Sequence, residues 1–123
     1  MKRDMDLIRE ILLKIEERPF DGMWFTLDID GCSPEAISYH VMLLHEAGLI
    51  EAYCDSALGS IDNWLPIRLT WQGHEFLDAA RDSTRWDQAK GIMTKVGGFA
   101  LEVLKAVLIE SAKSQALAYL KTP

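Results

Sequence analysis

Hydrophobic residues near the N-terminus recur at intervals of three and four, the spacing that places side chains on one face of an α-helix. The residues on this face are Met5, Ile8, Leu12 and Ile15. Pro19 and Gly22 end the predicted helix. Farther along, Phe25, Leu27 and Ile29 alternate with polar neighbours, and this period of two predicts a half-buried strand.

A second helix is expected between Ser33 and Gly48. Ser33 is a suitable N-cap, Pro34 suits the first turn, and Gly48 suits a left-handed C-terminal cap. The residues that this helix is expected to turn inward are Ile37, Val41 and Leu44.

Two strands, over residues 49–54 and 64–70, are expected to form a β-hairpin, or wing, around a loop at residues 56–63. Pro66 has no N–H group, so the second strand should lie at a sheet edge or contain a bulge at this residue.

Three further helices are predicted in the C-terminal part. One begins at Thr70, and the next is capped by Ser83 or Thr84. Residues 97–98, both glycine, break the pattern before a last helix over residues 99–120.

The predicted fold class is therefore α+β. The order helix, strand, helix, hairpin and helix is that of a winged-helix-like core, expected over residues 1–82. Residues 83–123 form a C-terminal helical extension, which either belongs to the same compact domain or serves as an oligomerisation element.

Two stretches resemble bacterial winged-helix regulators, including arsenic-repressor-type sensors. Residues 37–50 (ISYHVMLLHEAGLI) resemble the recognition helix and following turn, and residues 68–77 (RLTWQGHEFL) resemble the second wing strand and next helix. Together with the opening MKRDMDLIR and the glycine pair at 97–98, they make the chain similar to the domain-of-unknown-function family 2513. This resemblance implies a fold and a bacterial, prophage-like setting, but no established site residues.

The candidate recognition helix departs from the pattern of a DNA reader. A helix-turn-helix places a positioning helix directly before the recognition helix, whereas here a predicted strand occupies that place. Regulators of this shape present basic or amide side chains on the outer face. This helix presents Glu35, Ser38, Tyr39, Met42, His45 and Glu46.

Charge is distributed unevenly along the chain, whose net charge is −6. No Lys or Arg occurs between Arg18 and Arg68, an interval that holds the candidate recognition helix and most of the wing. DNA affinity comes largely from cations that neutralise phosphates, so this region is expected to repel a duplex. Its acidic surface either meets a protein partner or only keeps the protein in solution.

No motif for catalysis, a metal or a cofactor is complete. His45 and His74 each begin an HExxH-like pattern, but Leu49 and Asp78 stand where a second histidine would be needed. We therefore expect no enzyme activity, no metal site and no cofactor. Without a signal peptide or membrane span, a cytoplasmic protein is expected.

The last predicted helix is apolar on several sides, and such a helix needs more than one covering surface. One stripe is proposed for homo-oligomerisation, with packing inside the monomer as the alternative. This stripe consists of Leu101, Leu104, Leu108, Ala112 and Leu117.

The function expected from these features is that of a non-enzymatic protein-interaction module of mobile-element type. It would present an acidic face to a protein partner and self-associate through its C-terminal helix. The alternative is a DNA-binding transcriptional regulator that uses a non-standard or partner-assisted face. No membrane partner is expected.

Overall fold

The computed structural model describes residues 1–56 and 62–121, and the chain divides into two compact units. Unit 1 is Met1–Glu75 and unit 2 is Phe76–Pro123. The division falls within helix α3 (Trp71–Ala80), upstream of the boundary after residue 82 expected from the sequence.

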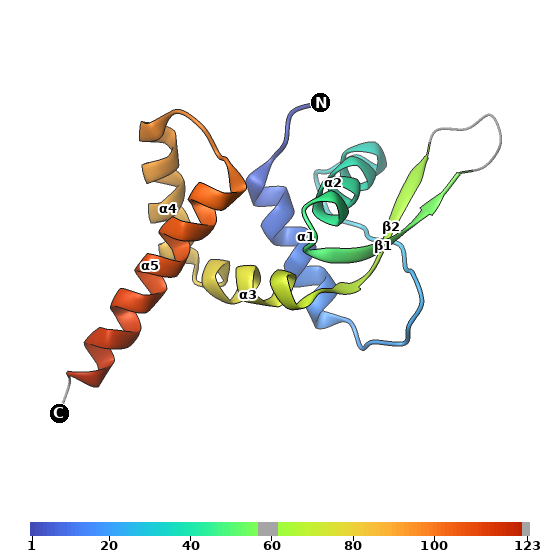
Figure 1. Cartoon of the computed structure of the whole chain (residues 1–123). Coiled ribbons are helices and arrows are strands. Elements are labelled where there is room, and N and C mark those ends of the chain that lie inside the picture. The colour runs from blue at the N-terminus through green and yellow to red at the C-terminus, as the bar shows by residue number, and fades with distance from the viewer. Residues whose placement is uncertain (57–61, 122–123) are drawn as a thin grey trace. The chain divides into compact units, whose positions relative to one another are not determined.

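Unit 1 contains two helices and a two-stranded hairpin, followed by the start of α3 (Figure 1). The helices are α1 (Met5–Glu17) and α2 (Pro34–Glu46), and the strands are β1 (Ile50–Asp55) and β2 (Asn63–Leu69). The two helices contact each other, and the hairpin contacts both of them. This arrangement confirms the predicted α+β class.

Side-chain caps determine where the two helices of unit 1 begin. The carboxylate of Asp4 accepts hydrogen bonds from the N–H groups of Asp6 and Leu7, and it caps α1. Ser33 caps α2 as predicted, since its Oγ accepts a hydrogen bond from the Ala36 N–H. Gly48 follows α2 with φ of +75°, the left-handed conformation expected there.

The strand predicted over residues 25–29 is wrong as a strand, although its burial pattern is right. Phe25 and Ile29 are buried and Leu27 is half-buried, as the alternation predicted. However, in the described residues the sheet has only β1 and β2. One backbone hydrogen bond, from the Phe25 N–H to the Pro66 carbonyl, joins the segment to the hairpin. The segment is therefore anchored by its buried side chains and this one hydrogen bond, without a hydrogen-bonded ladder.

The hairpin has the irregularity predicted at Pro66. β1 and β2 pair antiparallel from Ile50–Leu69 outward, and the register shifts so that Ala52 lies opposite Pro66. Ile67 is left without a partner in β1, which is the geometry of a bulge. The predicted loop falls largely on residues 57–61, which lie outside the described residues.

The core of unit 1 is apolar and draws on both helices and both strands. Its fully or nearly fully buried side chains include Ile11, Leu12, Val41, Leu44, Ile50 and Leu69. The inward residues predicted for α2, Ile37, Val41 and Leu44, are all buried.

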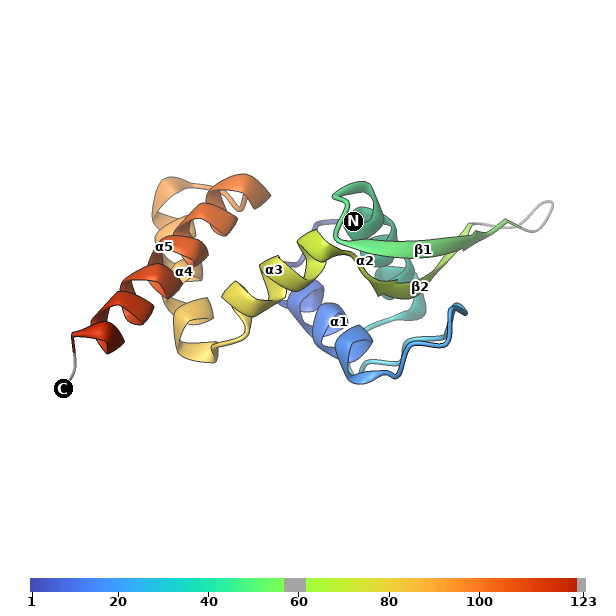
Figure 2. The same cartoon turned by 60° about the horizontal axis from the view of Figure 1, so that its bottom comes forward.

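Unit 2 contains the end of α3 and two helices, α4 (Ser83–Val96) and α5 (Leu101–Leu120). Helices α4 and α5 run in opposite directions and pack on each other (Figures 1 and 2). Gly97 ends α4 with φ of +89°, as the glycine pair predicted. The buried side chains of this unit include Phe76, Leu77, Trp86, Met93, Leu104 and Leu108.

The N-cap predicted for α4 is wrong by one or two residues. The cap is Asp82, whose carboxylate accepts a hydrogen bond from the Arg85 N–H, whereas Ser83 and Thr84 lie inside the first turn. A charged carboxylate is the stronger partner for the N–H groups at the positive end of a helix.

Candidate functional site

The outer face of α2 lies beside the beginning of β2, and together they form a pocket of about 660 Å³. We call it the α2 pocket. It brings together four of the six residues predicted for the outer face of the helix with residues of β2 and of the chain just before it. The lining residues are Met1, Pro34, Glu35, Ser38, Tyr39, Met42, Asp62, Asn63 and Trp64.

The two remaining predicted residues lie near the C-terminal end of α2. His45 is exposed, and its ring lies 5.3 Å from the ring of Trp64. Glu46 is exposed at the last residue of the helix. Ser38, Tyr39 and Met42 are only half-buried, so part of each side chain stays accessible within the pocket.

Two contacts join the α2 side of the pocket to its β2 side. The Trp64 N–H donates a hydrogen bond of 2.9 Å to Ser38 Oγ, and the Trp64 ring lies beside the His45 ring. Sequence reasoning did not include Trp64 in the site. The available signal was that it alternates with the inward-facing Leu65, which puts it on the opposite side of the strand.

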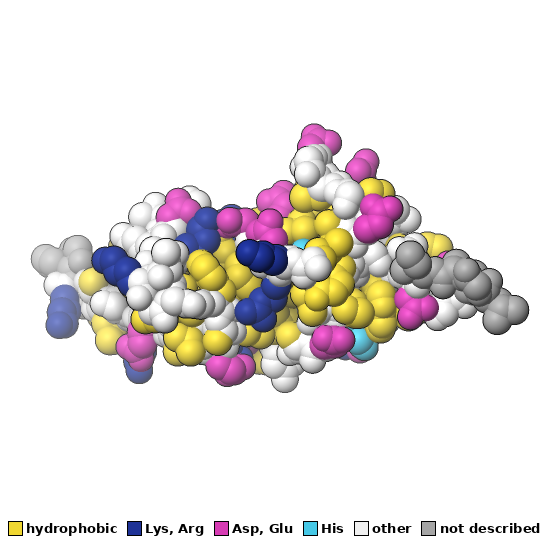
Figure 3. Space-filling view, turned by 90° about the horizontal axis from the view of Figure 1, so that it is seen from above, with side chains coloured by type: hydrophobic (Ala, Val, Ile, Leu, Met, Phe, Trp, Pro, Cys, Tyr) yellow, Lys and Arg dark blue, Asp and Glu magenta, His cyan; other side chains and the backbone are white. Residues whose placement is uncertain are grey.

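The pocket combines apolar and aromatic surface with two carboxylates. Tyr39, Met42 and Trp64 contribute the larger apolar groups, and Glu35 and Asp62 are both exposed. None of the described residues that line it is Lys or Arg. In the view of Figure 3, hydrophobic and acidic side chains, but no Lys or Arg, are visible toward the hairpin end of the molecule.

A buried histidine supports the helix on which the pocket is built. His40 Nδ1 donates a hydrogen bond of 2.7 Å to the Ala36 carbonyl, and Nε2 accepts one of 2.8 Å from the Asp4 N–H. These two bonds define a neutral tautomer with the proton on Nδ1. The bond to Asp4 connects α2 to the residue that caps α1, and it joins the two helices within unit 1.

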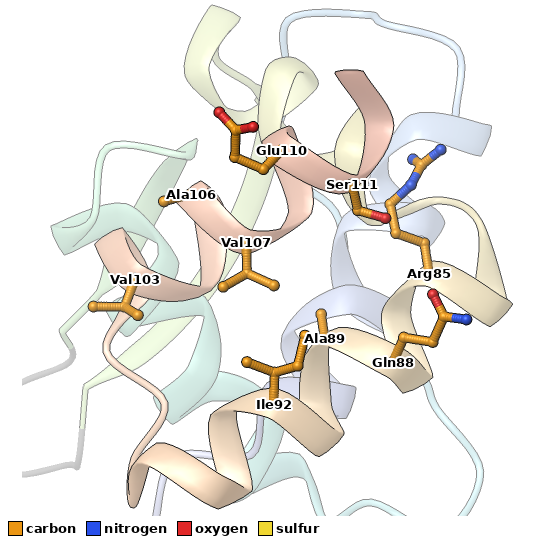
Figure 4. A pocket seen from close by; sticks show the side chains of 9 residues that line it. All are labelled: Arg85, Gln88, Ala89, Ile92, Val103, Ala106, Val107, Glu110 and Ser111. Atoms are coloured by element: carbon orange, nitrogen blue, oxygen red, sulfur yellow. The ribbon is translucent and has the colours of Figure 1, made fainter. Parts of the chain in front are cut away.

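A second concave surface lies in unit 2, between α4 and α5, and has a volume of about 510 Å³ (Figure 4). We call it the α4–α5 groove. Ile92 and Ala89 of α4 point toward Val103 and Val107 of α5 and form its apolar part. The polar residues of the groove are Arg85, Gln88, Glu110 and Ser111.

The residues predicted for oligomerisation do not form one accessible stripe. Leu104 and Leu108 are 0% exposed, and α5 packs on α4. Leu101 and Ala112 are half-buried, and Leu117 is 50% exposed. Leu104 and Leu108 thus belong to the interior of the monomer, which was the alternative that the sequence left open.

Apart from Leu117, the exposed large apolar residues of this unit lie outside the predicted stripe. They are Ile92, Val96, Val103, Ile109, Tyr119 and Leu120. Ile92 and Val103 line the α4–α5 groove, whereas Ile109 does not. Sequence periodicity missed this because α5 is apolar on several sides, so no single stripe stands out.

The described residues offer no metal site, since no group of three or more His, Cys, Asp or Glu side chains converges in them. Cys32 and Cys54 are both free and half-buried. Among the described helices, none is sufficiently long and apolar to span a bilayer.

Comparison with known proteins identifies relatives without a described activity. A family model described as "Hypothetical protein (DUF2513)" matches residues 2–100. An uncharacterized protein of Haemophilus influenzae is 42% identical over 109 residues, which cover 87% of this chain and 92% of the relative. No solved structure matches the chain significantly.

Proposed function

The chain belongs to the DUF2513 family, and we propose that it is a non-enzymatic module that binds a protein partner through the α2 pocket. The observation that carries this proposal is the composition of the pocket, in which apolar and aromatic groups meet two carboxylates without a Lys or Arg. Aromatic residues and Met are enriched at protein-binding surfaces, where a few such anchors supply most of the affinity.

The same face is poorly suited to DNA, the partner of the alternative proposal. A duplex-binding surface needs cations that contact phosphates, and residues 19–67 contain none. The cations that flank this interval are already engaged. Arg68 donates two hydrogen bonds to the Glu51 carboxylate. The Arg18 guanidinium lies 3.5 Å from the Asp21 carboxylate, and its central carbon lies 4.2 Å from the centre of the Phe25 ring.

Self-association is the second part of the proposal, and the α4–α5 groove is the surface that supports it best. Its apolar side chains remain accessible, with Ile92 46% exposed and Val103 47% exposed. Arg85 lies on one wall and Glu110 on the other, so two copies related by a twofold axis would offer each other opposite charges. A cytoplasmic location and a mobile-element setting complete the proposal.

Binding measurements with duplex DNA separate the protein-binding proposal from its alternative. We expect negligible fluorescence-anisotropy change with a generic duplex at low salt. Micromolar binding that weakens steeply as salt is raised would favour the DNA-binding alternative, because such a slope reports released counterions.

Photo-crosslinking tests the pocket directly. A photoreactive amino acid at Met42, inside the pocket, is expected to give one defined protein adduct in cells that naturally contain the protein. The same group at Lys113, an exposed position on α5 outside the pocket, should not give this adduct. Equal yields at both positions would contradict the proposal.

A further inference from the structure

We infer that the α2 pocket takes a cationic side chain, an arginine or lysine in a basic segment of the partner protein. This inference rests on the proposed function in one respect, namely that a protein partner binds at the α2 pocket. It adds the chemical class of the partner's side chain that enters the pocket.

The apolar surface of the pocket matches the long stem of such a side chain. Arginine and lysine bury their methylene groups along apolar surface while keeping the charged end near polar groups. Tyr39 and Trp64 add aromatic rings, over which a guanidinium or ammonium group is attracted by the ring electrons. A volume of about 660 Å³ accommodates this side chain together with neighbouring parts of a peptide.

The charged side chains that line the pocket, those of Glu35 and Asp62, are both acidic and favour a cation. Glu35 and Asp62 are exposed, and within residues 1–56 and 62–121 neither carboxylate forms an ion pair. A cation that enters the pocket is attracted by both carboxylates, whereas an anion is repelled by both.

An anionic ligand is the competing interpretation, because the N-terminus of α2 opens onto the pocket and helix N-termini attract anions. Here the terminus is already occupied. Ser33 Oγ accepts the hydrogen bond from the Ala36 N–H, and Glu35 supplies the negative charge of the first turn. A phosphate in the pocket would therefore be repelled by the carboxylates of Glu35 and Asp62, which line it.

The pocket also needs little rearrangement to bind. The hydrogen bond from the Trp64 N–H to Ser38 Oγ joins β2 to α2 without a ligand, and the His45 ring lies against the Trp64 ring. A site that is already formed loses less conformational entropy on binding.

The test is an NMR titration of the full chain with two acetylated, amidated tripeptides that differ only at the central residue. One carries arginine and the other citrulline, which has nearly the same shape without the charge. We expect the arginine peptide to shift the amide signals of Ser38, Tyr39, Met42 and the Trp64 indole. The citrulline peptide should bind at least about fivefold more weakly.

Matched carboxylate variants test whether the preference for the arginine peptide comes from the pocket. Glu35→Gln and Asp62→Asn should each reduce binding of the arginine peptide toward the level of the citrulline peptide. Glu46→Gln, which removes a carboxylate from the same helix outside the pocket, should leave it unchanged. The backbone spectrum of each variant shows at once whether the fold is retained.

Three outcomes would overturn the inference. The first is equal affinity for the arginine and citrulline peptides. The second is a loss of arginine-peptide binding in the Glu46→Gln variant as large as in the Glu35→Gln and Asp62→Asn variants. The third is a shift of the same signals by inorganic phosphate. If the arginine peptide fails while Met42 still crosslinks to a protein, the interaction module stands without a cation site. If the peptide binds but Met42 gives no adduct in cells, the cation site stands and the proposed function falls.

Discussion

At the junction between the hairpin and α3, the backbone leaves no space for a side chain at Gly73. A Cβ atom there would lie 1.9 Å from the carbonyl oxygen of Leu49. The same oxygen accepts a hydrogen bond from the Thr70 N–H, and Thr70 Oγ1 donates to the Gly48 carbonyl. Because the obstructing atom belongs to the backbone, the contact cannot be relieved by a rotamer change.

Replacing Gly73 by Ala is expected to lower the free energy of unfolding by about 1–3 kcal/mol, the usual cost of overpacking. Thermal or urea denaturation followed by circular dichroism measures this change. Gly91→Ala is the matched control, because a Cβ at Gly91 meets nothing within 4 Å and alanine favours the interior of α4. The control should be neutral or stabilising, and a loss of similar size in both variants would contradict the steric explanation.

Residues with local roles were easier to predict than residues with tertiary roles. Ser33 and Gly48 were identified from sequence because capping depends on neighbours within a few positions. Gly73 and His40 were not identified as constraints. Their importance comes from Leu49 and Asp4, which are distant in sequence, and no local pattern carries that information.

At the level of elements, the sequence located every helix and both strands of the hairpin. The prediction failed where a segment has buried side chains but no hydrogen-bonded strand partner. The period of two in residues 25–29 correctly predicted which side chains are buried, but burial alone does not produce a strand unless a neighbouring backbone is available to pair with it. In α5, apolar residues occur on several sides of the helix. The sequence pattern therefore did not reveal that Leu104 and Leu108 are buried inside the monomer.

The cap of α4 allows an element-level test. Asp82→Ala removes the carboxylate that accepts the Arg85 N–H, and we expect it to lower the free energy of unfolding by about 1 kcal/mol. Ser83→Ala and Thr84→Ala replace residues inside the first turn and should have little effect. Chemical denaturation of the three variants distinguishes them. An equal or larger loss in the Ser83 variant would show that the cap lies where the sequence first placed it.

Across the whole molecule, the two units carry different kinds of surface. Unit 1 presents the α2 pocket, which is apolar and acidic, whereas unit 2 presents the α4–α5 groove, which is apolar and contains both charges. Sequence composition predicted the acidic character of the first surface, since the interval without Lys or Arg is visible in the chain itself. It could not predict the groove, which exists only because two separate helices meet.

The α4–α5 groove leads to the prediction that concerns assembly. Val103→Glu places a carboxylate on the apolar part of the groove, and burying it against a second copy would be costly without a compensating partner. If the groove is the interface, this variant should elute as a monomer while the native chain elutes as an oligomer. Size-exclusion chromatography with light scattering over a range of concentrations measures the mass.

Ile109→Glu is the matched control for assembly. Ile109 is 44% exposed and Val103 is 47% exposed, and both lie on α5, but only Val103 lines the groove. The two variants therefore change charge and exposed apolar area almost equally, and they differ in position. Dissociation by Val103→Glu alone supports the groove, whereas dissociation by Ile109→Glu alone would move the interface to another side of α5. A native chain that remains monomeric at about 100 μM, a concentration well above the dissociation constant of a stable dimer, would remove self-association from the proposal.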